Sequence, residues 1–202
     1  MKKKSFWRRT NRGFLVSMVL LAAVLLYVAI TQIMLIPQRS TLQELGHKVS
    51  SLWESTMLSD AQLQELQQSE EKQEEFRNSF KSELAALFVD NSDYLDTATD
   101  SLLAYAVQEI QGEHRTTKRT LHKVKTQSCN ILEDTATVSM RFRYAINGDF
   151  FMYDGNEGSL QTCEGVDQLL FLELVCKRVD GEWKIYRISS LYDATDTMEG
   201  GY

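Results

Sequence analysis

The sequence predicts an α+β protein in which a transmembrane helix and a helical neck precede helices packed on a curved, cone-like antiparallel sheet. Three patterns predict this order. An uncharged apolar run lies near the N-terminus, helical apolar spacing follows it, and alternation of apolar and polar residues begins near residue 120. A series of helices followed by a series of strands is typical of the α+β class.

The charged residues are divided unevenly along the 202 residues of the chain. Residues 1–13 contain six basic residues and no acidic one, whereas residues 14–202 contain 16 basic and 28 acidic residues. This asymmetry indicates that the two parts lie in different compartments. A hydrophobic content of 43% with a single proline also favours a globular chain over a disordered one.

The apolar run extends from Phe14 to Ile36 without a charge. As a helix it would be about 35 Å long, enough to cross a bilayer. It is longer than the roughly 7–15 apolar residues of a signal peptide, and no small-residue cleavage site follows it. We therefore interpret residues 14–36 as a retained membrane anchor.

The orientation of the anchor follows from its flanking charges. Six basic residues precede it, and only Arg39 and Lys48 lie within about 20 residues after it. Because the more basic flank stays in the cytoplasm, residues 1–13 are predicted to form a cytoplasmic tail. The sequence thus predicts a single-pass protein of the cell membrane with residues 37–202 outside the cytoplasm.

Residues 37–75 are predicted to form the helical neck. Leu42, Leu45, Val49 and Leu52 recur at steps of three and four residues, the pattern of a coiled-coil seam. Two interpretations stay open. The seam joins copies of the chain, so that the neck forms a homo-oligomer, or it packs on the chain's own domain.

A further helix is predicted from the capping box of Ser59 and Gln62 to Val89. Between Asp60 and Glu83 it carries seven acidic and three basic residues, which is typical of a solvated helix face. Its second half has an apolar stripe that is expected to dock on the domain, namely Phe76, Phe80, Leu84, Leu87 and Phe88. We therefore begin the domain at residue 76.

After one more helix that ends near Gly112, the periodicity becomes that of strands. In "TATVSMRFRYAI" the apolar residues are predicted to face inward, whereas Arg141 and Arg143 face outward. The pairs Asn147-Gly148 and Asp180-Gly181 are predicted to form hairpin turns.

The closing segment "LLFLELVCKRVDGEWKIYRISSL" resembles the final hairpin of nuclear-transport-factor-two-like (cystatin-like) domains. The resemblance would cover residues 76–193, leaving residues 194–202 as a tail, and it implies a curved sheet wrapped around a helix. That superfamily includes enzymes, ligand binders and assembly modules, so the fold does not name a function. The overall plan also resembles the bitopic assembly proteins of type IV secretion and conjugation systems.

Enzymes of this superfamily use an acid/base pair inside the cone, and the resemblance implies four counterparts here: Tyr105, Tyr144, Glu173 and Tyr186. Glu173 stands within an apolar strand, where desolvation would raise its pKa toward a range useful for proton transfer. Alternatively, Glu173 lies on the outer sheet face as an ion pair with an arginine of a neighbouring strand.

Residues 114–125 form a basic stretch, which contains Arg115, Lys118, Arg119, Lys123 and Lys125 and no acidic residue. Such a patch could bind an anionic polymer, lipid headgroups or an acidic partner, or it could be a strand edge protected by lysines. Because no aromatic residues are interleaved for base stacking, no nucleic-acid partner is predicted.

Other chemistry has no support in the sequence. His47, His114 and His122 have no ligand spacing, so no metal site is predicted, and phosphate-binding, dinucleotide-binding and nucleophile motifs are absent, so no cofactor is predicted. The sequence thus predicts a non-catalytic binding or assembly module of the cell envelope, with protein partners there. The alternative is a small-ligand binder or enzyme that uses the cone interior, unless Phe142, Tyr144, Leu172 and Trp183 fill it.

Overall fold

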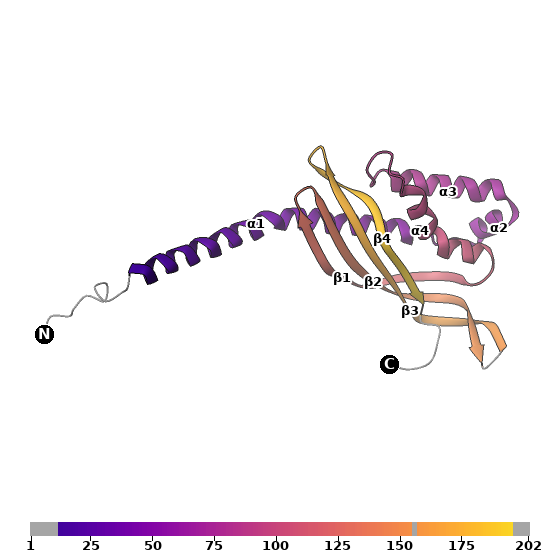
Figure 1. Ribbon diagram of the computed structural model, residues 1–202. Helices are drawn as coiled ribbons and strands as arrows, with labels where there is room; N and C mark the ends of the chain where they lie inside the picture. Colours follow the sequence, from indigo (N-terminus) through magenta and orange to yellow (C-terminus); the bar gives the residue numbers. More distant parts are fainter. Residues whose placement is uncertain (1–11, 155–156, 196–202) are drawn as a thin grey trace. The chain divides into compact units, whose positions relative to one another are not determined.

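The computed structural model describes residues 12–154 and 157–195 (Figure 1). The chain divides into two compact units, Met1–Ser40 and Thr41–Tyr202, and each is described by itself. Helices come first and one antiparallel sheet follows, so the predicted α+β class is confirmed.

The first unit contains the beginning of helix α1 (Arg12–Glu54). None of the apolar side chains between Phe14 and Ile36 is buried and most are exposed, and the mean hydropathy of the most apolar window of this helix is 2.7. The hydroxyls of Ser17 and Thr31 donate hydrogen bonds to carbonyls one turn earlier, so their polar groups are satisfied within the helix. By length and composition this segment is a candidate membrane span, a description that a signal sequence would also fit.

The second unit contains the end of α1 and three further helices, α2 (Asp60–Gln68), α3 (Glu70–Ala85) and α4 (Leu95–Ile110). The capping box predicted at Ser59 and Gln62 begins α2. The single long helix expected from there to residue 89 is instead divided at Ser69. This residue is extended, and its hydroxyl caps α3 by accepting a hydrogen bond from the backbone N–H of Lys72.

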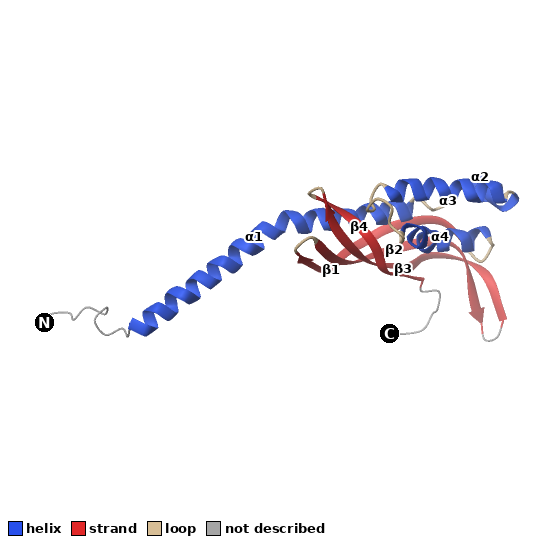
Figure 2. Cartoon of the chain, turned by 45° about the horizontal axis from the view of Figure 1, so that its top comes forward, coloured by secondary structure: helices blue, strands red, loops and turns tan. Residues whose placement is uncertain are grey.

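Four strands, drawn in red in Figure 2, pair in the order β1-β2-β3-β4: β1 (Arg115–Leu132), β2 (Thr135–Asp154), β3 (Glu157–Val179) and β4 (Glu182–Thr195). Every neighbouring pair is antiparallel. The turn predicted at Asp180-Gly181 joins β3 to β4, and both residues have positive φ.

The turn predicted at Asn147-Gly148 is wrong, because β2 runs through it. The register shifts at this point against both β1 and β3, so the pair forms a bulge. A Cβ on Gly148 would lie 1.8 Å from the carbonyl oxygen of Arg115, which explains why glycine is needed there.

The hydrophobic core lies against one face of the sheet, which we call the inner face. Its members on β2 and β3 alternate along each strand: Val138, Met140, Phe142, Tyr144, Ile146, Leu170, Leu172, Leu174 and Cys176. Residues of α1, α3 and α4 belong to the same cluster. The opposite, outer face contributes no residue to the core cluster between Thr137 and Arg143 or between Phe171 and Lys177.

The apolar stripe of the predicted neck belongs to this core. Leu42, Leu45 and Val49 are buried, and Gly46 lies so close to the sheet that a Cβ would meet the Met140 sulfur at 2.3 Å. Of the two interpretations left open by the sequence, packing on the chain's own domain is therefore the one observed. Consistent with this, the second compact unit begins at Thr41.

Candidate functional site

The interior of the curved sheet is filled with side chains. Phe142, Tyr144 and Leu172 are fully buried and Trp183 is 6% exposed, and all four belong to one core cluster. These are the residues whose packing decides whether a ligand can enter the interior. At these positions the inner side of the sheet is occupied by side chains of the protein itself.

Tyr144, a predicted ligand-binding residue, is bonded within this core. Its hydroxyl lies 2.6 Å from the Ser50 hydroxyl and donates a 2.9 Å hydrogen bond to Glu54. Its ring packs against the Trp53 ring, 5.3 Å between centroids. Burial raises the pKa of Tyr144, and the neighbouring Glu54 adds to this effect. The side chain is therefore a neutral phenol, and its contacts link α1 to β2.

Tyr105 and Arg119 complete the cluster around Trp53. The Arg119 guanidinium carbon lies 3.9 Å from the centre of the Trp53 ring and 5.3 Å from that of Tyr105. Its Nε donates to the side-chain oxygen of Gln168 on β3. Arg119 was expected in a surface patch, but it lies on the inner face because its backbone pairs with Ile146, an inner-face residue.

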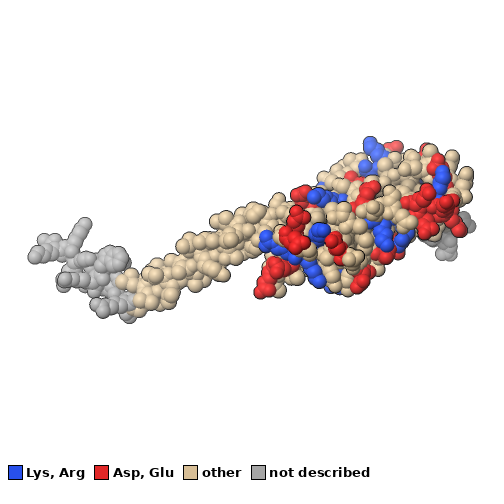
Figure 3. All heavy atoms as spheres, turned by 90° about the horizontal axis from the view of Figure 1, so that it is seen from above, with Lys and Arg blue, Asp and Glu red and all other residues tan. Residues whose placement is uncertain are grey.

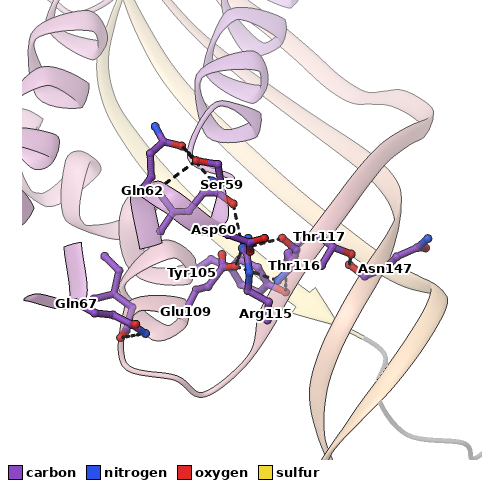
Figure 4. A network of polar contacts seen from close by, with 12 residues as sticks. Ser59, Asp60, Gln62, Gln67, Tyr105, Glu109, Arg115, Thr116, Thr117 and Asn147 are labelled. Atoms are coloured by element: carbon purple, nitrogen blue, oxygen red, sulfur yellow. Dashed lines mark hydrogen bonds and ion pairs between the residues drawn. The ribbon is translucent and has the colours of Figure 1, made fainter. Parts of the chain in front are cut away.

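Arg115 is also engaged within the domain (Figure 4). It forms an ion pair with Glu109, whose side chain is 1% exposed, and another with Asp60 at 2.7 Å. It donates as well to the carbonyl oxygen of Leu58, and Glu109 accepts from the backbone N–H of Thr116. This network joins the start of α2, the end of α4 and the start of β1. Its role is therefore structural, because it holds these three elements together.

His114 lies beside this network, with its ring 4.0 Å from that of Tyr105. Burial lowers its pKa to about 4, and the charges of Arg119 and Arg115 contribute. Its Nε2 atom is buried and has no hydrogen-bond partner in the described part of the chain. The imidazole is therefore neutral near pH 7.

Glu173 lies on the outer face, between the inward-facing Leu172 and Leu174. The hydroxyls of Ser189 and Ser139 donate to its carboxylate at 2.6 and 2.9 Å. These hydrogen bonds lower its pKa. Of the two alternatives left open by the sequence, the outer-face position is the one observed, and the carboxylate is held by serine hydroxyls rather than by an arginine. Its apolar neighbours in the sequence point to the other side of the sheet.

Tyr186 is separate from the cluster around Trp53. Its ring contacts Tyr94 edge-on at 5.2 Å, and the Lys177 ammonium lies 3.5 Å from its centre. The four residues of the predicted ligand site are thus divided: Tyr105 and Tyr144 both contact Trp53, whereas Glu173 and Tyr186 have other partners.

The predicted basic patch is rearranged by the fold. Arg115 and Arg119 are turned into the domain, whereas Lys118, Lys123 and Lys125 are exposed. On the outer face, basic residues from the other strands join Lys123 and Lys125 to form what we call the outer basic face: Lys123, Lys125, Arg141, Arg143, Lys177 and Arg187. The outward positions of the two β2 arginines are confirmed, but the sequence did not indicate that they lie opposite lysines of β1.

The domain surface has a mainly apolar groove of about 720 Å³ between the end of α1 and the end of α3, lined by Glu44, His47, Lys48, Ser51, Leu52, Ser55, Glu83, Ala86 and Leu87. A smaller hollow of about 180 Å³ lies between α4 and β4. Neither contains any of the predicted site residues. Among the described residues, no group of three or more His, Cys, Asp or Glu side chains is arranged to hold a metal ion.

No known protein family and no curated protein matches the chain. Among solved structures, it is similar to the intermembrane space region of chloroplast protein ARC6. The identity is 14%, the match covers 56% of this chain and 78% of that one, and the TM-score is 0.32. A similarity of this size assigns neither a fold family nor a function.

Proposed function

We propose that the protein is a membrane-anchored, extracytoplasmic and non-catalytic module that binds or assembles with protein partners of the cell envelope. One observation carries the proposal. The inner face of the sheet is filled by the chain's own side chains, while the described outer-face residues between Thr137 and Arg143 and between Phe171 and Lys177 include charged side chains and none of them belongs to the core cluster. A domain built in this way offers a surface for contacts rather than a cavity for a substrate.

The anchor and its orientation are part of this proposal. The exposed apolar segment of α1 supplies the membrane span, and the six basic residues that precede it favour a cytoplasmic N-terminus. We extend the proposal to membership of the nuclear-transport-factor-two-like superfamily, which the closing hairpin resembles. Its place would be in a cell-envelope or conjugative-transfer complex.

The anchor is tested by fusing topology reporters to each end of the full chain in the native cell. We expect an N-terminal reporter that is active only in the cytoplasm to be active, and an exported reporter at the C-terminus to be active as well. The chain should remain in the membrane fraction at its full mass. Loss of the N-terminal segment by cleavage, or the reverse orientation, would reject the anchored extracytoplasmic module.

The binding function is tested with a photo-crosslinking residue in place of Lys125 on the outer basic face. The matched control carries the same residue in place of Ser101, an exposed position of α4. Discrete crosslinked products from position 125, identified by mass spectrometry as envelope proteins, support the proposal. If neither position yields a product while the protein hydrolyses or retains a small molecule, the alternative that uses the interior is correct.

A further inference from the structure

The outer basic face contains like charges held directly opposite each other. Lys123 pairs with Arg143 and Lys125 with Arg141 in the register of β1 and β2, and all four side chains are exposed. Like charges at directly opposite positions destabilise an antiparallel pair. Asp167 forms an ion pair with Arg143, but neither lysine has a hydrogen bond or ion pair in the described part of the chain.

A second group of exposed like charges, in this case acidic, lies on α3. Glu70, Glu71, Glu74 and Glu75 are exposed, and none of them forms an ion pair or side-chain hydrogen bond within the described residues. Helical spacing turns Glu71 and Glu75 away from the buried Phe80 and Leu84, whereas Glu70 and Glu74 flank that buried side. We call these four residues the acidic surface. Figure 3 shows acidic side chains gathered at the end of the domain that contains α2 and α3.

The basic residues of α3 do not neutralise this surface because they are paired elsewhere. Lys72 pairs with Glu65 of α2, whereas Arg77 and Lys81 pair with Asp96 of α4. The basic residues of α3 therefore form ion pairs within the domain, and the four carboxylates of the acidic surface face the solvent. Their mutual repulsion at spacings of three and four residues would be relieved by an external cationic surface.

The two charged surfaces lie on opposite sides of the domain. Phe80 and Leu84 of α3 belong to the core that covers the inner face of the sheet, whereas the outer basic face is on the other side of the same strands. The acidic surface of one copy can therefore contact the outer basic face of the next copy. Such a contact uses a different surface on each of the two copies. Such a head-to-tail contact generates a ring or an open filament.

We propose that copies of this chain associate head to tail, with the acidic surface of one copy against the outer basic face of the next. This inference rests on the proposed assembly function and specifies its partner as a second copy. A second copy is favoured over an anionic polymer because residues 14–202 contain 28 acidic and 16 basic residues, so the domain as a whole repels a long polyanion.

The test measures the mass of the full chain in a neutral detergent by sedimentation velocity at about 50 mM and about 500 mM salt, since the Debye length shortens several-fold over this range. The wild-type chain should associate at low salt and dissociate at high salt. The variants E74K/E75K and K123E/K125E should each weaken the association at least about tenfold. The control E83K/E113K makes the same change in net charge as E74K/E75K, at exposed positions outside the acidic surface, and should associate like the wild type.

The decisive measurement mixes the two variants. E74K/E75K retains the outer basic face and K123E/K125E retains the acidic surface, but each would repel itself. Their altered surfaces are complementary to one another, so the mixture should regain the association that each has lost. A head-to-tail contact predicts this rescue, and general loss of folding does not.

A wild-type chain that stays monomeric at low salt, or a mixture that regains nothing, would overturn the proposal. If the monomeric wild type instead binds dextran sulfate and K123E/K125E does not, the outer basic face is a polyanion site and self-association is rejected. Crosslinks from position 125 to other envelope proteins would persist in that case. Failure of this inference is therefore distinguishable from failure of the proposed binding function.

Discussion

The two faces of the sheet differ although the same strands form both. On β2 and β3 the inner residues are almost completely buried, whereas the residues between them include Arg141, Arg143 and Lys177. Successive side chains of a strand point to opposite faces, so alternate residues of one strand are subject to different requirements. The inner residues determine the fold, and the outer residues are free to determine contacts.

Lys118 and Arg119 illustrate the difference within a single dipeptide. Lys118 is exposed, whereas the next residue lies over the Trp53 ring inside the domain. The two residues are equally basic, so composition alone does not separate them. Only their register against β2 assigns one to a surface and the other to the core.

The largest effect is expected from Trp53→Ala, which removes the ring that Tyr105, Tyr144 and Arg119 share. We expect the free energy of unfolding to fall by about 3–5 kcal/mol, because a large buried side chain is lost and Arg119 loses its aromatic partner. Chemical unfolding of the full chain in detergent, followed by far-ultraviolet circular dichroism, measures the change. Leu121→Ala, at a side chain 41% exposed, is the control and should cost about 1 kcal/mol or less. Equal effects would show that the buried Trp53 ring contributes no more to stability than an exposed apolar side chain of β1.

The second prediction concerns the network at the end of α4. Glu109→Ala should lower the free energy of unfolding by about 2–4 kcal/mol, because it leaves the Arg115 guanidinium without its buried partner and the Thr116 N–H without an acceptor. Asp60 is the other partner of Arg115, and its side chain is 89% exposed. Asp60→Ala should therefore lower the free energy of unfolding by about 1 kcal/mol or less. The same unfolding measurement compares the two. A larger effect for Asp60→Ala would contradict the structural role assigned to the buried pair.

Local patterns predicted the fold class and several of its parts. The capping box at Ser59, the alternation that leads to Ile146 and the turn at Asp180-Gly181 each depend on residues that are neighbours in the sequence. Such signals act over a few residues, so they can be interpreted without knowing the rest of the fold.

The features that were missed depend on residues far apart in the sequence. Gly148 forms a bulge rather than a turn because its backbone must approach Arg115 on a strand that begins 33 residues earlier. The two charged surfaces were missed for the same reason. The opposition of Lys123 and Arg143 is a product of strand register, which the sequence of either strand alone does not contain.

A third prediction uses the pH dependence of the inner side. Because the pKa of His114 falls from its ordinary value of 6.5 to about 4 on folding, the folded state favours the neutral ring. This contribution to stability is fully present above pH 6.5 and is lost as the pH falls from 6.5 toward 4. The wild-type chain should therefore lose stability in that window, and His114→Phe should flatten the profile there. Thermal unfolding at a series of pH values provides the measurement. An unchanged profile in the variant would show that other groups, such as the carboxylates with lowered pKa, account for the loss.

The smallest effect on the free energy of unfolding is expected on the outer face. Glu173→Ala tests the difference between the two faces within the single strand β3. The substitution removes the carboxylate that accepts from the hydroxyls of the exposed Ser189 and of Ser139, which is 5% exposed. We expect a loss of about 0.5–1.5 kcal/mol in the free energy of unfolding, the net contribution of ordinary hydrogen bonds. Leu172→Ala, at the preceding position but on the inner face, should cost about 2–5 kcal/mol.

The lowered pKa of Glu173 adds a second readout to this pair. Its contribution to stability is present at neutral pH and is lost as the pH falls through the carboxylate range, so the difference between Glu173→Ala and the wild type should shrink on acidification. The cost of Leu172→Ala should not depend on pH in this way, because no titratable group is removed. If instead the two adjacent substitutions were equally destabilising and equally insensitive to pH, the outer side chain would be part of the packed structure, and the outer face would no longer be free to carry contacts.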